Sequence, residues 1–365
     1  MKPFSGLYYI KENKGKSLLV IFMLMLTTFI FVAGNYIHSV FWYWGKAIEY
    51  EDRIVMIDAI STDEDFRDYR AILEDLRKDG RVTVLERSAR GYTGLSWDCT
   101  MGFEMGSSSF VFTSVEDMKT AFQHLGITCD YSNLKENSVV MSSALAKNRG
   151  LEVGDVLDQT VEKSISGTYT FDAMIDDDSF ILFYIKNDGE QSMARAYIMS
   201  DELSGDALRQ YISDVQNGRK LKISGKIKDE IDEQMDPFKL VFFVAIVLVS
   251  IILAVTINAV LTGQYVKRTY EFGVYRALGR SKGNVFRKVT GEILIMDLLA
   301  ILTGFALMFL MIFLLNELLY KPSGKYLPYG SGMGILGFLL SNILVVIPTI
   351  LLKGRKLAKA DVTEF

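Results

Sequence analysis

Four long apolar segments constrain this chain more than any other feature of its 365 residues. The hydrocarbon core of a bilayer is about 30 Å thick, and a helix needs roughly 20 apolar residues to cross it. Each of the four segments is near or above that length. We therefore predict transmembrane helices over four ranges of the sequence: 18–45, 238–262, 292–316 and 333–352.

The first apolar segment is expected to remain in the protein as a membrane anchor. Lys11, Lys14 and Lys16 precede it, as basic residues precede a signal peptide. Its roughly 25 apolar residues, however, exceed the core of a signal peptide. It ends in the aromatic run 41–44, which is typical of a membrane interface and unlike the small residues of a cleavage site.

Charge is divided unevenly along the chain and predicts its orientation. Residues 47–236 carry 37 acidic and 21 basic side chains, whereas the rest of the chain carries 7 acidic and 19 basic. Fifteen of those 19 basic residues lie before the first span, between residues 267 and 288, or from Lys353 onward. With four spans these three regions share one side, which the positive-inside rule makes the cytoplasm.

This orientation predicts a multi-pass protein of the bacterial plasma membrane with both termini in the cytoplasm. The cytoplasmic parts would be an amphipathic helix over 1–17, which lies at the lipid surface, a connecting region over 263–291 and a tail over 353–365. The acidic segment 46–237 and a short loop over 317–332 would lie outside.

The segment 46–237 is predicted to be an α+β domain. Short apolar runs at 53–58, 82–85, 110–112, 138–141 and 180–185 are typical of strands. Residues 65–78 and 114–125 are predicted helices between them, and the second begins with the capping pattern Ser114-x-x-Asp117. Runs of both kinds in one segment indicate an α+β fold.

A stalk helix is expected where this domain returns to the membrane. Ile227, Ile231 and Met235 recur every fourth residue among charged residues, which places them on one face of a helix. A helix continuing outward from Lys46 would be its partner.

The sequence gives no sign of catalysis or of a bound metal. It has two histidines and two cysteines, far apart, and neither an HExxH nor a CxxC motif. No nucleotide-binding or nucleic-acid-binding motif occurs. Asp297 is the one acidic residue placed deep in a predicted span, and no inverted repeat accompanies it, which argues against a gradient-driven carrier. We expect no catalytic, metal or cofactor site in this chain.

Cys99 and Cys129 both fall in the predicted external domain. An oxidising exterior permits a disulfide between them. Two buried thiols are the alternative, and the sequence leaves both open.

The region between the second and third predicted spans carries a recognisable motif. An Arg and a Glu precede a Gly, then comes Arg-Ala-x-Gly, and a Glu follows where the next span begins, at positions Arg268, Glu271, Gly273, Arg276, Ala277, Leu278, Gly279 and Glu292. A second pattern, Ala-x-x-x-Gly-Leu-x-x-Gly-Asp, covers Ala146 to Asp155. Together with the topology, these patterns resemble the FtsX/MacB-type permease family of ATP-binding-cassette (ABC) systems, also called type VII.

The resemblance implies that this chain is a permease subunit and not an enzyme. ATP and Mg²⁺ would be bound by a separate cytoplasmic ATPase present in two copies, and the permease would pair with a second copy or a paralogue. The fold would be four transmembrane helices with the external domain inserted between the first and second. ATP hydrolysis would then move the external domains, a mechanism called mechanotransmission.

The motif residues are predicted to couple the permease to the ATPase. Four apolar side chains would supply contact surface: Phe272, Val274, Tyr275 and Leu278. The charged residues would pair with the partner, and Gly273 and Gly279 would allow close approach and a turn. The predicted coupling set is Arg268, Glu271, Phe272, Gly273, Arg276, Ala277, Leu278 and Gly279. A basic helix resting on anionic lipid is the alternative, although it leaves Glu271 and the two glycines unexplained.

Two functions follow from this assignment. One is export or extrusion of amphipathic cargo, such as antimicrobial peptides, drugs or lipids. The other is transmission of a signal to an external partner, for example a cell-wall hydrolase.

Overall fold

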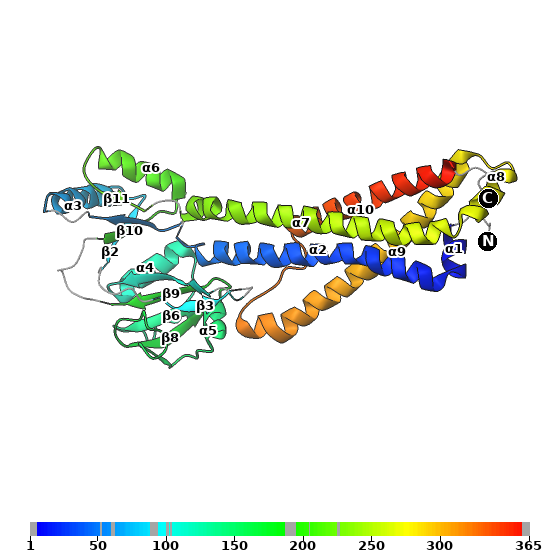
Figure 1. Cartoon of the computed structure of the whole chain (residues 1–365). Helices are drawn as coiled ribbons and strands as arrows, with labels where there is room; N and C mark the ends of the chain where they lie inside the picture. The colour runs from blue at the N-terminus through cyan, green and yellow to red at the C-terminus, as the bar shows by residue number, and fades with distance from the viewer. Residues whose placement is uncertain are drawn as a thin grey trace. The chain divides into compact units, whose positions relative to one another are not determined.

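The computed structural model describes residues 6–51, 53–59, 63–87, 94–99, 102, 104–186, 195–203, 205–224 and 227–359. The chain divides into two compact units (Figure 1). The membrane unit consists of Met1–Ser39, Asp236–Asn316 and Leu327–Phe365, and the inserted unit of Val40–Met235 and Glu317–Tyr326.

The membrane unit is helical. Among the described residues, four helices are long and apolar enough to cross a bilayer, which confirms the predicted number of spans. They are α2 (Lys14–Ala47), α7 (Ile227–Val266), α9 (Lys282–Leu315) and α10 (Gly332–Lys359). Two short helices accompany them, α1 (Gly6–Glu12) and α8 (Thr269–Ala277).

Small residues let the membrane helices approach closely. A Cβ atom added at Gly34 of α2 would lie 2.5 Å from the Cα of Gly334 in α10. Next to this crossing, the Ser331 hydroxyl donates to the Asn35 side-chain oxygen at 2.6 Å, and both side chains are buried. Close packing through glycine, with interhelical hydrogen bonds, is how membrane helices associate where lipid removes the hydrophobic drive.

The inserted unit contains a four-stranded antiparallel sheet with strand order β11-β1-β10-β2. Along the chain, two strand–helix–strand units form this sheet, β1-α3-β2 and β10-α6-β11, which is the split βαβ arrangement. The elements are β1 (Val55–Asp58), α3 (Asp63–Lys78), β2 (Thr83–Arg87), β10 (Arg195–Met199), α6 (Gly205–Gln216) and β11 (Lys222–Ile223). Side chains from both helices and from β1 and β10 form one buried cluster, so α3 and α6 cover the same face (Figure 1).

A second sheet is formed by the chain between β2 and β10. It has five strands in the order β5-β9-β6-β8-β7, with parallel and antiparallel neighbours. The elements are β5 (Ser108–Phe112), α4 (Val115–Leu125), β6 (Ser138–Ser142), α5 (Ser143–Arg149), β7 (Val156–Leu157), β8 (Tyr169–Ile175) and β9 (Ile181–Ile185). A separate ribbon pairs β3 (Ser96–Asp98) with β4 (Glu104–Gly106).

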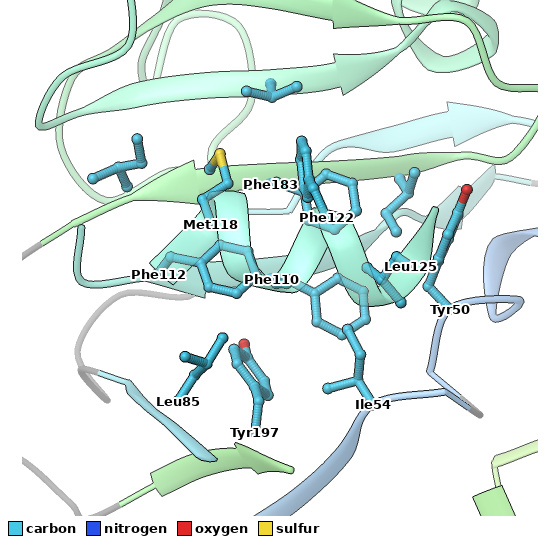
Figure 2. Packing of buried hydrophobic residues seen from close by; sticks show 14 of the residues in the cluster. Tyr50, Ile54, Leu85, Phe110, Phe112, Met118, Phe122, Leu125, Phe183 and Tyr197 are labelled. Atoms are coloured by element: carbon cyan, nitrogen blue, oxygen red, sulfur yellow. The ribbon is translucent and has the colours of Figure 1, made fainter. Parts of the chain in front are cut away.

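The two sheets share a hydrophobic core that is rich in aromatic side chains. Figure 2 shows Leu85 and Tyr197 from the first sheet facing Phe110 and Phe112 of the second. The helix α4 adds Phe122, whose ring lies edge-on to Phe183 at 4.7 Å. One continuous core therefore holds both sheets in a single domain.

The α+β class predicted from the sequence is confirmed. The predicted apolar runs fall on β1, β2, β5, β6 and β9, and the two predicted helices are α3 and α4. The Ser114 hydroxyl accepts a hydrogen bond from the backbone N–H of Asp117 at 3.1 Å, which is the predicted cap.

The first stalk helix was predicted wrongly. The helix expected to continue outward from Lys46 ends one residue later, because α2 stops at Ala47 and turns follow it. The Lys46 ammonium instead pairs with the Asp178 carboxylate at 2.9 Å, in the turn between β8 and β9.

Candidate functional site

The short helix α8 lies between the second and third spans and contains half of the motif residues, with three more directly beside its ends. Arg268 occupies its N-cap position. The helix ends at Ala277, and Gly279 has a φ of +84°, a left-handed conformation that glycine adopts without strain. The Ser281 hydroxyl then caps α9 by accepting from the backbone N–H of Asn284 at 3.2 Å. The chain therefore turns sharply from α8 into the third span.

Arg268 joins two carboxylates that are far apart in the sequence. Its Nε and Nη2 atoms donate to Glu271 at 2.8 and 3.2 Å. Its Nη1 and Nη2 atoms donate to Glu292 at 2.7 and 3.1 Å. Since Glu292 belongs to α9, this one guanidinium fastens the start of α8 to the third span.

The network around Glu292 is balanced in charge and buried. Lys288 places its ammonium 3.5 Å from the Glu292 carboxylate, and the Tyr265 hydroxyl donates to the same group at 3.4 Å. The side chains of Glu292, Lys288 and Arg268 are 0%, 1% and 10% exposed. Arg268, Lys288 and Glu292 are therefore largely removed from water, and the partly exposed Glu271 is the second anion that offsets the two cations.

The ion pairs keep Glu271 and Arg268, which lie between the second and third spans, in their charged forms. Burial raises the pKa of Glu271, but hydrogen bonds from Arg268 and the charges of Arg268 and Lys288 lower it by more, so this pKa lies below its ordinary value. Burial lowers the pKa of Arg268, and Glu292 and Glu271 raise it by more. The guanidinium therefore stays charged.

Aromatic packing closes this network on one side. The Phe272 side chain is fully buried and belongs to a cluster with Tyr265, Val285 and Val289. The Arg268 guanidinium lies 4.9 Å from the centre of the Phe272 ring. Phe272 thus holds α8 against the neighbouring helices and stabilises the cation over its ring.

The opposite face of α8 is apolar and exposed. Tyr270, Val274 and Leu278 follow one another every fourth residue, with exposed fractions of 71%, 39% and 75%. Exposed Lys267 precedes this row and exposed Arg280 follows it. We call Tyr270, Val274 and Leu278 the α8 stripe.

The structure divides the predicted coupling residues into two groups. Phe272 and Gly273 are buried, so the prediction that Phe272 offers contact surface is wrong. The side chains of Arg268 and Glu271 are 10% and 37% exposed. Glu271 is paired with Arg268 of its own chain, and its predicted contact with a partner stays a prediction. Arg276 is partly exposed, and the residues with exposed surface are Ala277, Leu278 and Gly279.

Sequence reasoning left out several residues of this site. Tyr265 and Lys288 belong to the buried network, and Glu292 had no assigned role although it stood in the motif. Tyr270 was left out of the predicted contact surface, whereas Val274 was part of it and is exposed, as predicted. The spacing of 270, 274 and 278 by four residues was the signal available for the stripe.

The predicted stalk residues Ile227, Ile231 and Met235 fall within the backbone range of α7. Their side chains lie outside the described residues. The apolar seam therefore stays a prediction.

Of the two alternatives that the sequence left open for Cys99 and Cys129, the disulfide is not formed. Cys99 is buried in the cluster that contains Tyr43 and Trp97. Cys129 packs instead against the core shared by the two sheets. The structure therefore supports the alternative of two separated thiols.

One comparison with known families concerns the C-terminal part of the membrane unit. The model of the FtsX-like permease C-terminal domain matches residues 240–361. This segment is an FtsX-like permease domain. The match confirms the resemblance to FtsX/MacB-type permeases, and it includes α8 and the whole network around Arg268. A search of the curated proteins found no match.

The match and the four apolar helices of the described residues point to a multi-pass membrane protein. The FtsX-like permease family indicates a membrane component of an ABC-type transporter or signalling system. In this family the ATPase is generally a separate subunit. The matched range begins within α7, so most of the inserted unit lies outside it.

Proposed function

We propose that this chain is the permease subunit of an ABC system and that a separate cytoplasmic ATPase docks on the α8 stripe. The observation that carries the proposal is the two-sided construction of α8. Its inner face is fastened to α9 by Arg268 and Glu292, and its outer face exposes Tyr270, Val274 and Leu278. A push on the outer face would therefore reach the third span through a buried ion pair.

The composition of the stripe favours a protein partner over lipid. Apolar side chains at every fourth position are what an amphipathic helix presents to a groove on another protein. Lys267 and Arg280 at its two ends would pair with an acidic rim on the ATPase. A helix bound to anionic lipid needs the cations. It does not need α8 to be fixed to α9.

The rest of the assembly follows the family. We propose two ATPase copies and a second permease, either a copy or a paralogue, with ATP-driven movement passed to the inserted domain by mechanotransmission. The domain would act outside the cell on amphipathic cargo that is exported or extruded. The excess of basic residues in the segments beside the spans supports the orientation with both termini in the cytoplasm.

Copurification with the ATPase tests the docking site. Leu278→Ser removes an exposed apolar side chain worth about 2 kcal/mol on burial, so affinity should fall roughly 30-fold. Tyr270→Ser should have a similar effect. Lys282→Gln, at the exposed start of α9, is the matched control and should retain the ATPase. If Lys282→Gln loses the ATPase and Leu278→Ser keeps it, α8 is a lipid anchor.

The structure decides which substitutions in α8 test docking of the ATPase and which disturb the buried network instead. Glu271→Lys would place a third cation beside Arg268 and Lys288, so it would disrupt the buried network whether or not a partner contacts residue 271. Substitutions in the stripe leave that network intact and report on docking alone.

Orientation is tested by an impermeant thiol reagent on intact cells. A cysteine replacing the exposed Glu152 should be labelled, and one replacing Lys282 should not. Labelling in the opposite sense would place the ATPase-docking face outside and end the proposal.

Cargo sensitivity separates export from signalling. Cells lacking the permease should become more sensitive to amphipathic peptides or drugs, and the wild-type chain should restore resistance where Leu278→Ser does not. Unchanged sensitivity with altered cell-wall hydrolysis would point to a signal transmitter.

A further inference from the structure

The segment between the third and fourth spans belongs to the inserted unit. Residues Glu317–Tyr326, which we call the connector, group with Val40–Met235 and not with the spans that flank them. The connector consists of most of η2 (Asn316–Tyr320, a π-helical turn), η3 (Lys321–Ser323, a 3₁₀ turn) and the three residues after it. The inserted unit is therefore joined to the membrane unit by four chain crossings.

The connector is a closed and internally bonded loop. At its base, Asn316 donates to the Leu327 carbonyl at 2.9 Å and accepts from the Leu327 N–H at 2.7 Å. Within it, the Lys325 N–H donates to the Tyr320 carbonyl at 2.8 Å, and the Lys321 ammonium pairs with Glu317. A compact loop whose ends meet behaves as a preformed element.

The middle of the connector contacts α5 directly through its backbone. Gly324 has a φ of +63°, and a Cβ atom there would lie 2.3 Å from the Ala144 carbonyl oxygen. The Asn148 side chain donates to the Ser323 carbonyl at 3.1 Å. Glycine is therefore required at 324 both for the conformation and for the close approach.

The last residue of the connector is held by a buried tyrosine. The Tyr43 hydroxyl donates to the Tyr326 carbonyl at 2.6 Å and accepts from the Tyr326 N–H. Tyr43 is 1% exposed, and its ring packs edge-on against Trp97 and Phe180. Undocking the connector would leave this buried hydroxyl without its two partners.

Further bonds tie the same surface to the start of the inserted domain. The Asp177 carbonyl accepts from the Ala144 N–H at 3.2 Å and from the Ser143 hydroxyl at 3.1 Å. The Asp177 carboxylate accepts from the Tyr50 hydroxyl. The connector, α5 and the turn after β8 therefore form one bonded group at the end of the domain where α2 enters.

We propose that the connector is a permanently docked part of the inserted domain and that the third and fourth spans drive the domain through it. This inference rests on the proposed function, because it continues the path from α8 to the third span as far as the inserted domain. A hinge at this position would require the loop to leave α5. The Gly324 contact and the Tyr43 bonds oppose that movement.

The first test compares two glycines by hydrogen exchange of the full chain in detergent. Gly324→Ala should speed exchange in the connector and in α5 together, by about tenfold or more. Gly332→Ala is the matched control, because a Cβ there meets open space, and it should change exchange less than about twofold. Tyr43→Phe keeps the ring and removes only the hydroxyl, so it should loosen the same two segments if Gly324→Ala fails to fold.

The second test measures coupling to the ATPase. Gly324→Ala and Tyr43→Phe should keep the ATPase bound, because α8 is untouched, and should lose most of the cargo-dependent or permease-dependent change in ATPase rate. Bridging a cysteine pair at Asn148 and Ser323 in a Cys129→Ser background should leave coupling within about twofold of the unbridged protein.

The results separate the two proposals. Loss of coupling on bridging, or full coupling in the loosened variants, would overturn the role of the connector. Failure of the wild-type chain to retain an ATPase would reject the proposed function. In that case hydrogen exchange alone would test the docking of the connector. Amide exchange in the connector that changes independently of exchange in α5 would refute the docking.

Discussion

Removing Arg268 should loosen α8 far more than removing its partner Glu271. The Glu292 side chain is 0% exposed, and its shortest contacts, at 2.7 and 3.1 Å, come from Arg268. Lys288 and the Tyr265 hydroxyl remain only at 3.5 and 3.4 Å. Arg268→Gln therefore leaves a buried carboxylate poorly compensated, which costs about 3–5 kcal/mol. Glu271 is 37% exposed, so Glu271→Gln should cost roughly 0.5–1 kcal/mol.

Hydrogen exchange of the purified protein in detergent measures this difference locally. If α8 exchanges by opening from α9, amide rates in residues 269–277 should rise roughly 150- to 4,000-fold in Arg268→Gln and about 2- to 5-fold in Glu271→Gln. Lys282→Gln serves as the control and should leave these rates unchanged. Equal effects of the first two variants would show that the pair with Glu292 does not fasten α8 to α9, so that a push on the α8 stripe would not reach the third span through this pair.

Three further outcomes are expected. The pKa of Glu271 lies below its ordinary value of 4.5, so its pair with Arg268 should protect α8 equally at all pH values above 4.5. The protection should be lost as the pH falls through the lower pKa of the folded state, and hydrogen exchange in α8 should become faster only there. Gly34→Leu should lower the thermal midpoint of unfolding in detergent by an amount equivalent to about 1–3 kcal/mol, because a Cβ at residue 34 would lie 2.5 Å from the backbone of α10. Gly263→Leu is the control and should leave the midpoint unchanged, because a Cβ there meets open space. Equal midpoints would refute the close crossing of α2 and α10. Burial, with the charge of Asp130, raises the pKa of Cys129 to about 11, so its thiol should react slowly with maleimide in the folded protein. In denaturant, Cys99 and Cys129 should both react without a reductant. A requirement for reductant would indicate a disulfide.

The elements that could be predicted are those determined by local pattern. The four spans follow from uninterrupted apolar length, which no other fold satisfies as well. The capped start of α4 follows from Ser114 and Asp117, three residues apart. The left-handed Gly279 follows from the need to end a helix before a turn. Each of these signals lies within a single stretch of chain.

The position of α8 in the chain was predicted correctly, but which of its faces is buried was not. The motif located α8, and its residues were all assigned to one contact surface. The helix has two faces, and only packing decides which of them is buried: Phe272 enters the membrane-unit core while Leu278 remains exposed. The pairing of Arg268 with Glu292 joins residues 24 positions apart, so no spacing within α8 could reveal it.

The sequence by itself determined that this chain crosses a membrane four times, that an acidic α+β domain is inserted after the first crossing, and that a motif-bearing helix lies between the second and third. Hydrophobic length, alternation and helix-ending residues act locally, so they can be seen in the sequence. Only the tertiary structure decided the sheet orders, the separation of Cys99 from Cys129, the buried network at Arg268 and the docking of the connector on α5. These depend on which distant surfaces meet, and that is set by the shape and burial of the whole core.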